Sequence, residues 1–321
     1  MHRRHFLGSL AGLGLSTAVP SSAATDLLPL KTTFRGKEKF DAVVAKALAQ
    51  QWATKPIGQR MALIAVELRS TPYVGYTLEI DDKIESPSVN LEGLDCWTFF
   101  ETVLCLARML EKPKPSYTPQ DLLAEIEWTR YRAGKCTGNY LERIHYLNEW
   151  FVDNFARGTI NDITNRLGAD IPLKGRLSRE MTVLWKSYRY LRCNPDLRPK
   201  MAALEEKVNS LPVRYIPEAK VPGIEPQLRN GDIIGIVSAG QGGVCSHVGL
   251  IFRPSTDGLA RFMHASSKYK KVTLDVTISE YLSDHKDAIG ILVGRALPVT
   301  QTVTDPVTYE ANLKRITSVS S

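Results

Sequence analysis

One cysteine lies where the sequence predicts the start of a helix. Cys96 ends the segment Asn-Leu-Glu-Gly-Leu-Asp-Cys (90–96), and an apolar stretch with helical periodicity follows it to about Leu110. Asp95 is a good N-cap, which places Cys96 at the first helical position. There the helix dipole and the free backbone N–H groups favour an anion, lower the pKa of a thiol and could hold an oxyanion. Cys96 is therefore a candidate nucleophile; the alternative is a small core residue, which is our interpretation of Cys105 in the same helix.

Two histidines are candidates for the base that a thiol nucleophile needs. His247 begins an apolar run, and His264 lies at the end of the next predicted strand. Adjacent strands joined by the turn around 254–258 would place the two imidazoles side by side, one as the base and the other as its orienting partner. Each histidine alone is more often a packed or surface residue. The combination with Cys96 is what indicates nucleophilic catalysis.

Metal catalysis is the rival chemistry. His145, His247 and His264 could form a zinc site, but the chain has no His-Glu-x-x-His, and nothing in the spacing of these histidines demands a metal. The glycines at 240–243 follow a strand without opening a helix, so they do not form a phosphate loop. Ser246 lacks the Gly-x-Ser-x-Gly context of a serine nucleophile. We therefore expect neither a metal nor an organic cofactor.

The elements that must position these residues are helices first and strands afterwards. Helical periods predict helices over 37–52, 59–68 and 139–155, a capped helix from Thr118-Pro119, and helical pieces over 178–191 and 199–208. Strand patterns follow over 232–237, 247–252, 259–265, 271–276 and 289–295, with a short helix over 279–285. This order predicts an α+β fold. The polar tail over 301–321 is expected to be loosely held.

The first residues read as a targeting segment. Arg3 and Arg4 precede the apolar run 7–19, and Ser21–Ala24 supplies small residues for cleavage. This pattern resembles a twin-arginine export signal over residues 1–24. No other stretch is long and apolar enough to span a bilayer. We therefore expect an exported, periplasmic protein without a membrane span.

Composition and charge are those of an ordinary enzyme, with 43% hydrophobic and 23% charged residues. The net charge of +7 falls to +5 when Arg3 and Arg4 are removed, and the basic residues are scattered, so no nucleic-acid partner is predicted. An anionic wall polymer is compatible with this charge. Of the five cysteines, Cys136 and Cys193 could form a disulfide, and the role of Cys245 stays open.

Several short strings, taken in order, are similar to a known family. They are Asp95-Cys-Trp-Thr-Phe, Gly231-Asp-Ile-Ile-Gly, Ser246-His-Val-Gly-Leu and Met263-His-Ala-Ser. Together they resemble the NlpC-type papain-like cell-wall cysteine hydrolases. A narrower similarity is to the N-acetylmuramoyl-L-alanine amidase-like branch, and it covers about residues 55–297. It rests on residues 71–75 with 77–79, on 90–96, and on 140–146 with Glu149-Trp150.

The resemblance implies a papain-like α+β hydrolase domain over 25–300, with a helical insertion over about 115–228. It implies Cys96 as the nucleophile, His247 as the base and His264 as the third polar residue. It also implies substrate contacts for five further residues: Tyr73, Asp95, Ser246, Arg143 and His145. Tyr73 could instead be a core aromatic residue and Asp95 a cap alone. Trp97 is bulky for a residue lining a cleft and departs from the family pattern.

The activity implied is hydrolysis of peptidoglycan fragments at the amide between the muramic acid lactyl group and L-alanine. One alternative keeps the thiol chemistry and cuts the γ-D-glutamyl-diamino acid bond of the stem peptide. Another is a non-catalytic wall-binding protein. The sequence does not distinguish intact wall from released muropeptides, and it predicts no oligomeric state.

Overall fold

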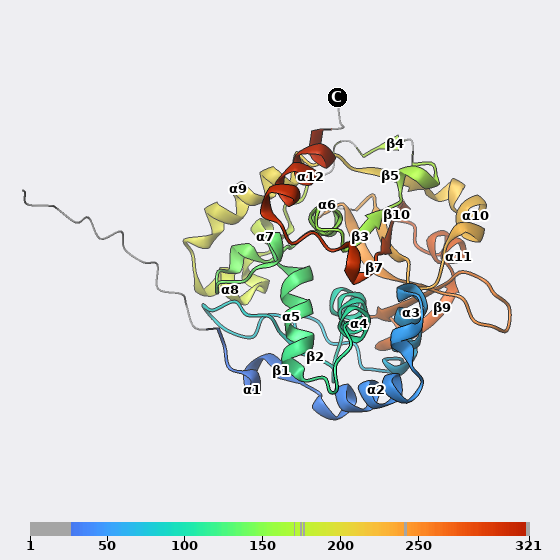
Figure 1. The fold of residues 1–321 in the computed structure, drawn as a ribbon. Helices are drawn as coiled ribbons and strands as arrows, with labels where there is room; N and C mark the ends of the chain where they lie inside the picture. Colours follow the sequence, from blue (N-terminus) through green and yellow to red (C-terminus); the bar gives the residue numbers. More distant parts are fainter. Residues whose placement is uncertain (1–26, 170, 174, 176, 241–242, 319–321) are drawn as a thin grey trace, which may run out of the picture.

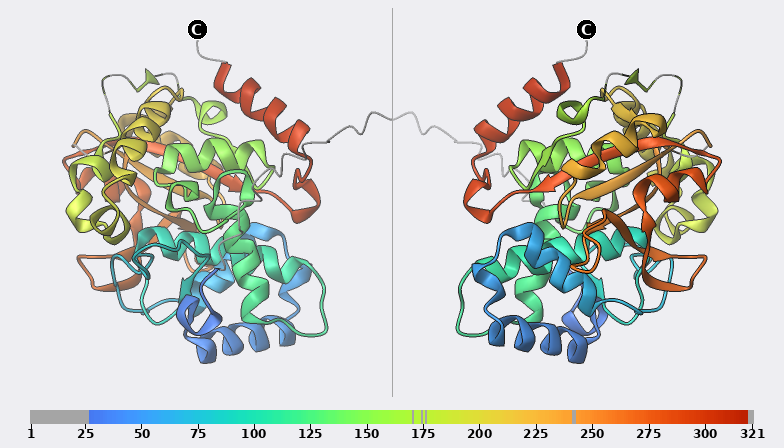
Figure 2. Two further views of the ribbon diagram at one scale, coloured as in Figure 1. Left: turned by 90° about the vertical axis from the view of Figure 1, so that its left-hand side faces the viewer. Right: turned by 90° about the vertical axis from the view of Figure 1, so that its right-hand side faces the viewer.

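The C-terminal half of the chain forms an antiparallel sheet, and helices from the N-terminal half cover one of its faces. A computed structural model describes residues 27–169, 171–173, 175, 177–240 and 243–318. The export signal expected over 1–24 lies outside these residues. Figures 1 and 2 show the two layers, with the early helices below and the later strands above. Within the described residues, no helix has both the length and the apolar character needed to cross a membrane.

The described residues contain twelve α-helices, and nine of them end by Asn209, as the sequence predicts. They are α1 (Leu30–Thr33), α2 (Lys37–Ala49), α3 (Ile57–Glu67), α4 (Cys96–Glu111), α5 (Pro119–Arg130), α6 (Leu147–Ala156), α7 (Glu180–Val183), α8 (Arg189–Cys193), α9 (Leu197–Asn209), α10 (Val221–Ile224), α11 (Ile278–Ser283) and α12 (Pro306–Ser318). The predicted start of α5 is confirmed: Thr118 is its N-cap, Pro119 is its first residue, and Thr118 and Asp121 form a capping box.

The strands form one large sheet and a two-stranded parallel pair. They are β1 (Phe34–Arg35), β2 (Val89–Asn90), β3 (Ile160–Asp162), β4 (Ile171–Pro172), β5 (Arg214–Pro217), β6 (Ile233–Ser238), β7 (Cys245–Phe252), β8 (Arg261–Ser266), β9 (Lys271–Thr277) and β10 (Ala288–Ala296). The large sheet has the order β4-β5-β10-β6-β7-β8-β9, with β3 also paired to β10. All its pairings are antiparallel. The α+β class is therefore confirmed.

Two apolar cores lie on opposite faces of this sheet. The larger one joins α2, α3, α4 and α5 to residues such as Val248, Leu250 and Met263. The smaller one joins α10 and α11 to residues such as Ile251 and Phe262. Neighbouring residues of a strand point to opposite faces, and both faces of the sheet are covered. The central strands β6 and β10 are therefore almost fully buried and their sequences are nearly continuous apolar runs.

The helix α4 is the centre of the molecule. Every residue from Thr98 to Leu110 is buried, and α4 contacts α3, α5, β7 and β8. Two charged side chains inside it are paired with α5: Glu101 with Arg130, and Arg108 with Glu125. Buried charges are tolerated when they are paired in this way, so these contacts fix the position of α4 against its neighbour.

Two expectations about elements are wrong. The helix predicted over 139–155 is interrupted, because Arg143 is extended and Ile144 donates its N–H to the carbonyl oxygen of Arg130 at 2.9 Å. Only α6 remains as α-helix. The described part of the tail, up to Ser318, is not loosely held, because α12 packs on α6: the Tyr309 hydroxyl donates to Asp153 at 2.8 Å and the Asn312 amide to a backbone carbonyl at 3.0 Å.

The stretch 115–228, expected to be a helical insertion, contributes to the sheet as well. It contains α5 to α10, and also β3 and β5, which both pair with β10, and β4, which pairs with β5. A third small core forms among α7, α8 and α9 around Tyr140, Tyr190 and Met201. This cluster forms one wall of the site described next.

Candidate active site

Cys96 occupies the first position of α4, as the capping pattern predicts. The carboxylate of Asp95 accepts the backbone N–H of Thr98 at 2.8 Å, and the Thr98 hydroxyl oxygen accepts the N–H of Asp95 at 2.9 Å. This reciprocal capping box defines where the helix begins. Cys96 is partly exposed, and its sulfur accepts a hydrogen bond from the backbone N–H of Val248 in β7. The start of α4 therefore meets the strand that carries His247.

The two candidate histidines lie side by side on neighbouring strands. His247 on β7 and His264 on β8 are joined by a hydrogen bond of 2.6 Å between Nε2 of the first and Nδ1 of the second. Aromatic rings hold both imidazoles: Phe262 stacks on His264 at 4.7 Å, and Tyr281 of α11 lies parallel to His247 at 6.2 Å. The strand pairing thus brings together the two residues that the sequence places 17 positions apart.

Asp275 extends this hydrogen-bonded pair of histidines, and the sequence patterns did not single it out as a site residue. It lies on β9, and its Oδ2 is 3.2 Å from Nε2 of His264. The register explains the contact, because His264 pairs with Thr273, and Asp275 is two residues further along the same face. The available signal was the single acidic side chain of the predicted strand 271–276, where polar and apolar residues alternate.

Cys96 and His247 are both neutral before a substrate binds. Burial, followed by the negative charge of Asp95, raises the pKa of the Cys96 thiol to about 12. The expected lowering by backbone N–H groups is present but smaller than the burial effect. Burial, followed by the positive charges of His264 and His285, lowers the pKa of His247 to about 3. The sequence-based expectation of a low thiol pKa is therefore wrong, because local position did not reveal how much water is excluded.

A cavity of about 360 Å³, called the main cavity below, opens beside Cys96. It is lined by seven of the eight residues singled out in the sequence: Tyr73, Asp95, Cys96, Arg143, His145, Ser246 and His247. The eighth, His264, lies behind His247. Aromatic side chains form much of the remaining wall: Tyr76, Trp97, Tyr146 and Tyr188.

Tyr73 lies close to the nucleophile position. It forms a parallel bridge with Leu94, the residue before Asp95. Burial, then the negative charges of Cys96 and Asp95, raises the pKa of Tyr73 to about 12. Its hydroxyl is therefore protonated near neutral pH and can donate a hydrogen bond into the main cavity.

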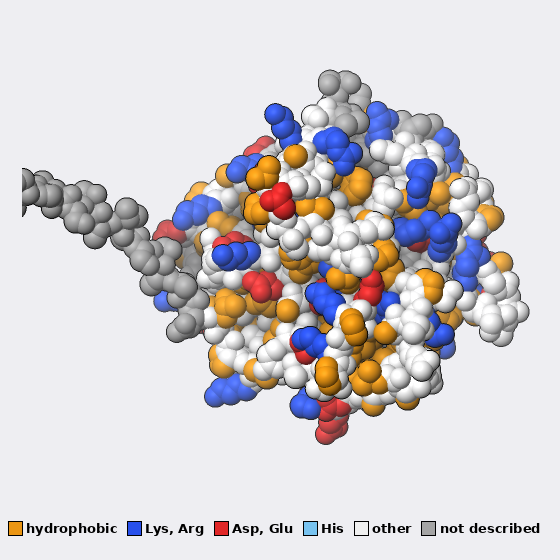
Figure 3. Space-filling view, in the orientation of Figure 1, with side chains coloured by type: hydrophobic (Ala, Val, Ile, Leu, Met, Phe, Trp, Pro, Cys, Tyr) orange, Lys and Arg blue, Asp and Glu red, His pale blue; other side chains and the backbone are white. Residues whose placement is uncertain are grey.

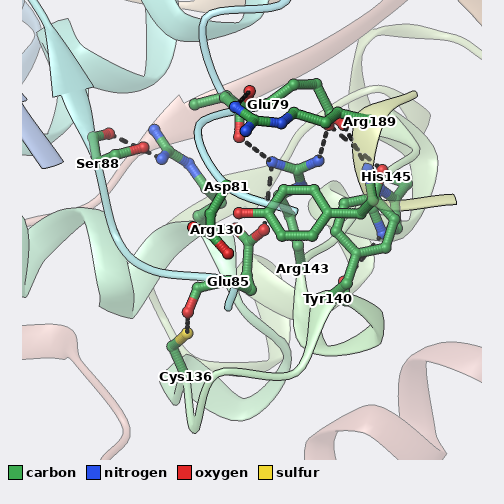
Figure 4. Close-up of polar contacts among 12 residues, drawn as sticks. Glu79, Asp81, Glu85, Ser88, Arg130, Cys136, Tyr140, Arg143, His145 and Arg189 are labelled. Carbon is green, nitrogen blue, oxygen red and sulfur yellow. Dashed lines mark hydrogen bonds and ion pairs between the residues drawn. The ribbon is translucent and has the colours of Figure 1, made fainter. Parts of the chain in front are cut away.

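Arg143 is bound to protein carboxylates at the wall of the main cavity (Figure 4). Its guanidinium pairs with Glu79, lies 3.5 Å from Glu85 and is 4.6 Å from the ring centre of Tyr140. The side chain is only 4% exposed. Its charge is thus largely balanced within the protein, and the predicted contact with a substrate carboxylate stays a prediction.

His145 is held by the same cluster. One ring nitrogen lies 3.3 Å from the carbonyl oxygen of Tyr140, so it donates there, and the two rings are 4.8 Å apart. Burial, then the positive charge of Arg143, lowers the pKa of His145 well below its usual value. His145 is therefore neutral, and its predicted role in binding also stays a prediction.

None of the five cysteines, all of which lie in the described residues, forms a disulfide. Cys136 contacts the carbonyl oxygen of Glu85 at 3.6 Å, while the exposed Cys193 lies 3.4 Å from a carboxylate oxygen of Asp82. Cys245 lines the main cavity. Among the described residues, His, Cys, Asp and Glu side chains form no group of three suited to a metal ion.

The comparison with family models matches most of the chain. Residues 63–291 match the AmiA-like family, described as N-acetylmuramoyl-L-alanine amidase-like. The chain belongs to this family. The matched segment contains every residue that lines the main cavity, together with His264 and Asp275. No curated protein sequence matched the chain.

Solved structures resemble this member of the amidase-like family over most of its length. An N-acetylmuramoyl-L-alanine amidase from Bacteroides uniformis is 29% identical, with a TM-score of 0.67, covering 75% of this chain and 98% of its own. A protein from Bacteroides fragilis described as a candidate xylanase is 31% identical, with a TM-score of 0.64 and coverages of 72% and 98%. A Legionella pneumophila protein at 22% identity shares the fold, with a TM-score of 0.60 and coverages of 83% and 98%.

Proposed function

We propose that this protein is a thiol-dependent N-acetylmuramoyl-L-alanine amidase of the NlpC-type papain-like superfamily, acting on peptidoglycan fragments. The observation that carries the proposal is the meeting of the α4 start with the histidine pair. Cys96 accepts an N–H from the residue that follows His247, and His247 is hydrogen-bonded to His264. The family and the Bacteroides uniformis structure support an amide of peptidoglycan as the bond.

The hydrogen-bond chain assigns the protons of the two imidazoles. An ionised carboxylate only accepts, so Nε2 of His264 carries a proton and donates it to Asp275. Burial also lowers the pKa of His264, so this ring is neutral and its Nδ1 holds a lone pair. That lone pair accepts from Nε2–H of His247. The free lone pair of His247 is therefore on Nδ1, the nitrogen that we assign to the base.

The reaction then runs as acyl transfer through Cys96. Nδ1 of His247 takes the thiol proton as the sulfur attacks the lactyl carbonyl carbon, which forms a tetrahedral intermediate. The same proton passes to the amide nitrogen, the C–N bond breaks, and an L-alanyl peptide leaves. A water molecule gives a proton to His247 and attacks the thioester. The lactyl acid leaves and the thiol is restored.

Backbone and side-chain donors near Cys96 suit the oxyanion of this intermediate. The first N–H groups of α4 have no partner within the helix and lie at its positive end. Tyr73 adds a protonated hydroxyl beside them. Donors fixed in this way stabilise the charge that develops in the transition state.

The neutral resting pair fits general-base catalysis. With the thiol pKa near 12 and the His247 pKa near 3, the sulfur and the imidazole do not form an ion pair before substrate binds. Proton transfer therefore accompanies attack. This differs from thiol enzymes in which a thiolate forms in advance.

The cell-wall substrate also implies a place for the protein. The export pattern of residues 1–24 supports a periplasmic location. On the face in Figure 3, lysine and arginine side chains are spread over the described surface and are not gathered in one band. The described part of this face therefore carries no continuous basic band of the kind that tracks a long anionic polymer.

Mass spectrometry of defined muropeptides tests the proposal. Mature protein should release a free L-alanyl peptide and a sugar with a free lactyl acid, and Cys96→Ala should release neither. Cys105→Ala is the matched control, because Cys105 lies on the same helix but is fully buried. Cleavage after the γ-D-glutamyl residue would reassign the bond to the endopeptidase alternative. If no product depends on Cys96, the remaining alternative is the non-catalytic wall-binding protein.

A further inference from the structure

A second cavity lies on the far side of His247. It has a volume of about 260 Å³ and shares Ser246 and His247 with the main cavity. Its other walls come from the β8–β9 turn and from the end of α11, including Ser266, Lys268 and His285. The two cavities therefore meet at the proposed base. No residue pattern in the sequence pointed to this second space.

The second cavity is linked to the reacting sulfur through shared walls. Ser246 and His247 line both cavities, and Cys96 lines the main cavity. Tyr281 of α11, whose ring lies parallel to that of His247 at 6.2 Å, lines the second cavity. A substrate whose scissile bond lies at Cys96 can extend one part into each cavity.

The roles of the two parts follow from the position of the base. The group that gives a proton to the leaving nitrogen must lie within hydrogen-bond reach of it. The acyl part stays on Cys96, next to the aromatic wall formed by Tyr76, Trp97 and Tyr188. The leaving part must then pass His247, and the second cavity is the space directly beyond that ring.

Most polar groups in the second cavity are already engaged. His264 and Asp275 bond to each other, and Ser266 accepts the N–H of Tyr269 at 3.2 Å. His285 donates its Nδ1–H to a backbone carbonyl at 2.6 Å, which leaves its Nε2 for another partner.

Lys268 is the cation of this cavity. Its Nζ lies 5.4 Å from the ring centre of Tyr269, and no carboxylate of the described residues is within ion-pair distance of it. Two acidic side chains line the cavity: Asp275, which is bonded to His264, and Asp284, which follows the end of α11. The cavity therefore offers one free ammonium group for an anion and one carboxylate for a hydrogen-bond donor or an amine.

We infer that the second cavity binds the leaving peptide and that Lys268 holds a free carboxylate of that peptide. This inference rests on the proposed function and adds the recognition of the leaving side. In a stem peptide that continues through a γ-glutamyl bond, the α-carboxylate next to L-alanine stays free. Converting that carboxylate to a carboxamide removes the charge with almost no change in size, and this gives a matched ligand pair.

Equilibrium binding to Cys96→Ala tests the inference without turnover. The probes are the peptide L-Ala-γ-D-Glu-diaminopimelate and its α-carboxamide analogue. A charge-assisted hydrogen bond contributes about 1.5 kcal/mol or more, so the carboxylate peptide should bind about tenfold more tightly. Adding Lys268→Met should remove this preference and leave the affinity for the carboxamide unchanged. Lys286→Met is the control, because Lys286 is exposed on the neighbouring loop and lines neither cavity.

The outcomes separate this inference from the proposed function. The assignment of Lys268 is overturned if Cys96→Ala does not prefer the carboxylate peptide over the carboxamide. It is also overturned if that preference is unchanged after Lys268→Met is added. If the wild-type enzyme cleaves muropeptides while binding is independent of Lys268, the function stands and the subsite is wrong. If binding depends on Lys268 but no muropeptide is cleaved, the subsite stands and the proposed reaction is wrong.

Discussion

Replacing Asp275 with asparagine isolates the charge at the end of the histidine chain. The side chain keeps its size and can still accept from Nε2 of His264, 3.2 Å away. What disappears is the negative charge that stabilises His247 when it becomes an imidazolium during attack. Asp275 takes no part in bond making or bond breaking in this scheme and acts through His264, so it is a positioning residue.

The expected loss follows from Coulomb's law. With 2.6 Å between the histidines, 3.2 Å to Asp275 and the width of one ring, the two charges are about 8 Å apart. At an effective dielectric constant of about 20 this is about 2 kcal/mol, or a ~30-fold lower kcat.

Steady-state kinetics on a defined muropeptide measures this effect. We expect kcat to fall and KM to stay the same, with a thermal midpoint close to that of the wild type. Asp257→Asn is the matched control, since Asp257 is partly exposed, pairs with Arg261 on β8 and lies outside the site. A kcat within threefold of the wild type, or a loss confined to KM, would refute the proton chain that we assign.

Three further predictions concern the thiol, the base and the helix that carries the thiol. The rate at which iodoacetamide labels Cys96 should rise with pH beyond about pH 9, because the thiolate reacts and the pKa is raised to about 12; a plateau near neutral pH would indicate an ion pair. The pKa of His247 is lowered to about 3 in the folded protein, against 6.5 in the unfolded chain. The free energy of unfolding should therefore be full above pH 6.5 and fall between pH 6.5 and pH 3, because the unfolded chain takes up a proton there and the folded protein does not. Urea unfolding should show that His247→Gln loses up to about 4 kcal/mol less than the wild type over this pH range, and equal losses in both proteins would contradict the shift. Glu101→Ala should lower the free energy of unfolding by about 3–5 kcal/mol, because it leaves the buried Arg130 without its carboxylate partner. Asp41→Ala, which removes an exposed ion pair with Lys37, should lower it by less than about 1 kcal/mol. Similar losses in these two variants would contradict the prediction.

Local patterns were sufficient for the position of the nucleophile and for the main elements. Asp95 and Thr98 are neighbours in sequence, so the capping box that starts α4 depends on few residues outside it. The strands of the later sheet were recognisable because they are apolar, short and separated by turns. Pairing the two histidine strands needed only the rule that consecutive strands joined by a short turn lie side by side.

Long-range contacts account for what the sequence did not reveal. Asp275 reaches His264 only through the register of β8 and β9, which no single strand pattern defines. The helix predicted over 139–155 is broken by a bridge between Arg143 and Tyr131, at the end of a different helix. The pKa of Cys96 depends on its burial where α4 meets β7, and this burial outweighs the helix-terminus effect that the local sequence does predict.

The central claim is that acyl transfer passes through the sulfur of Cys96. Intact-protein mass spectrometry of an acid-quenched reaction, followed by peptide mapping, tests it directly. The account predicts a thioester carrying the lactyl-sugar part, located on Cys96 and absent from Cys96→Ala. Full muropeptide cleavage by Cys96→Ala, with no adduct on the wild-type protein, would contradict it.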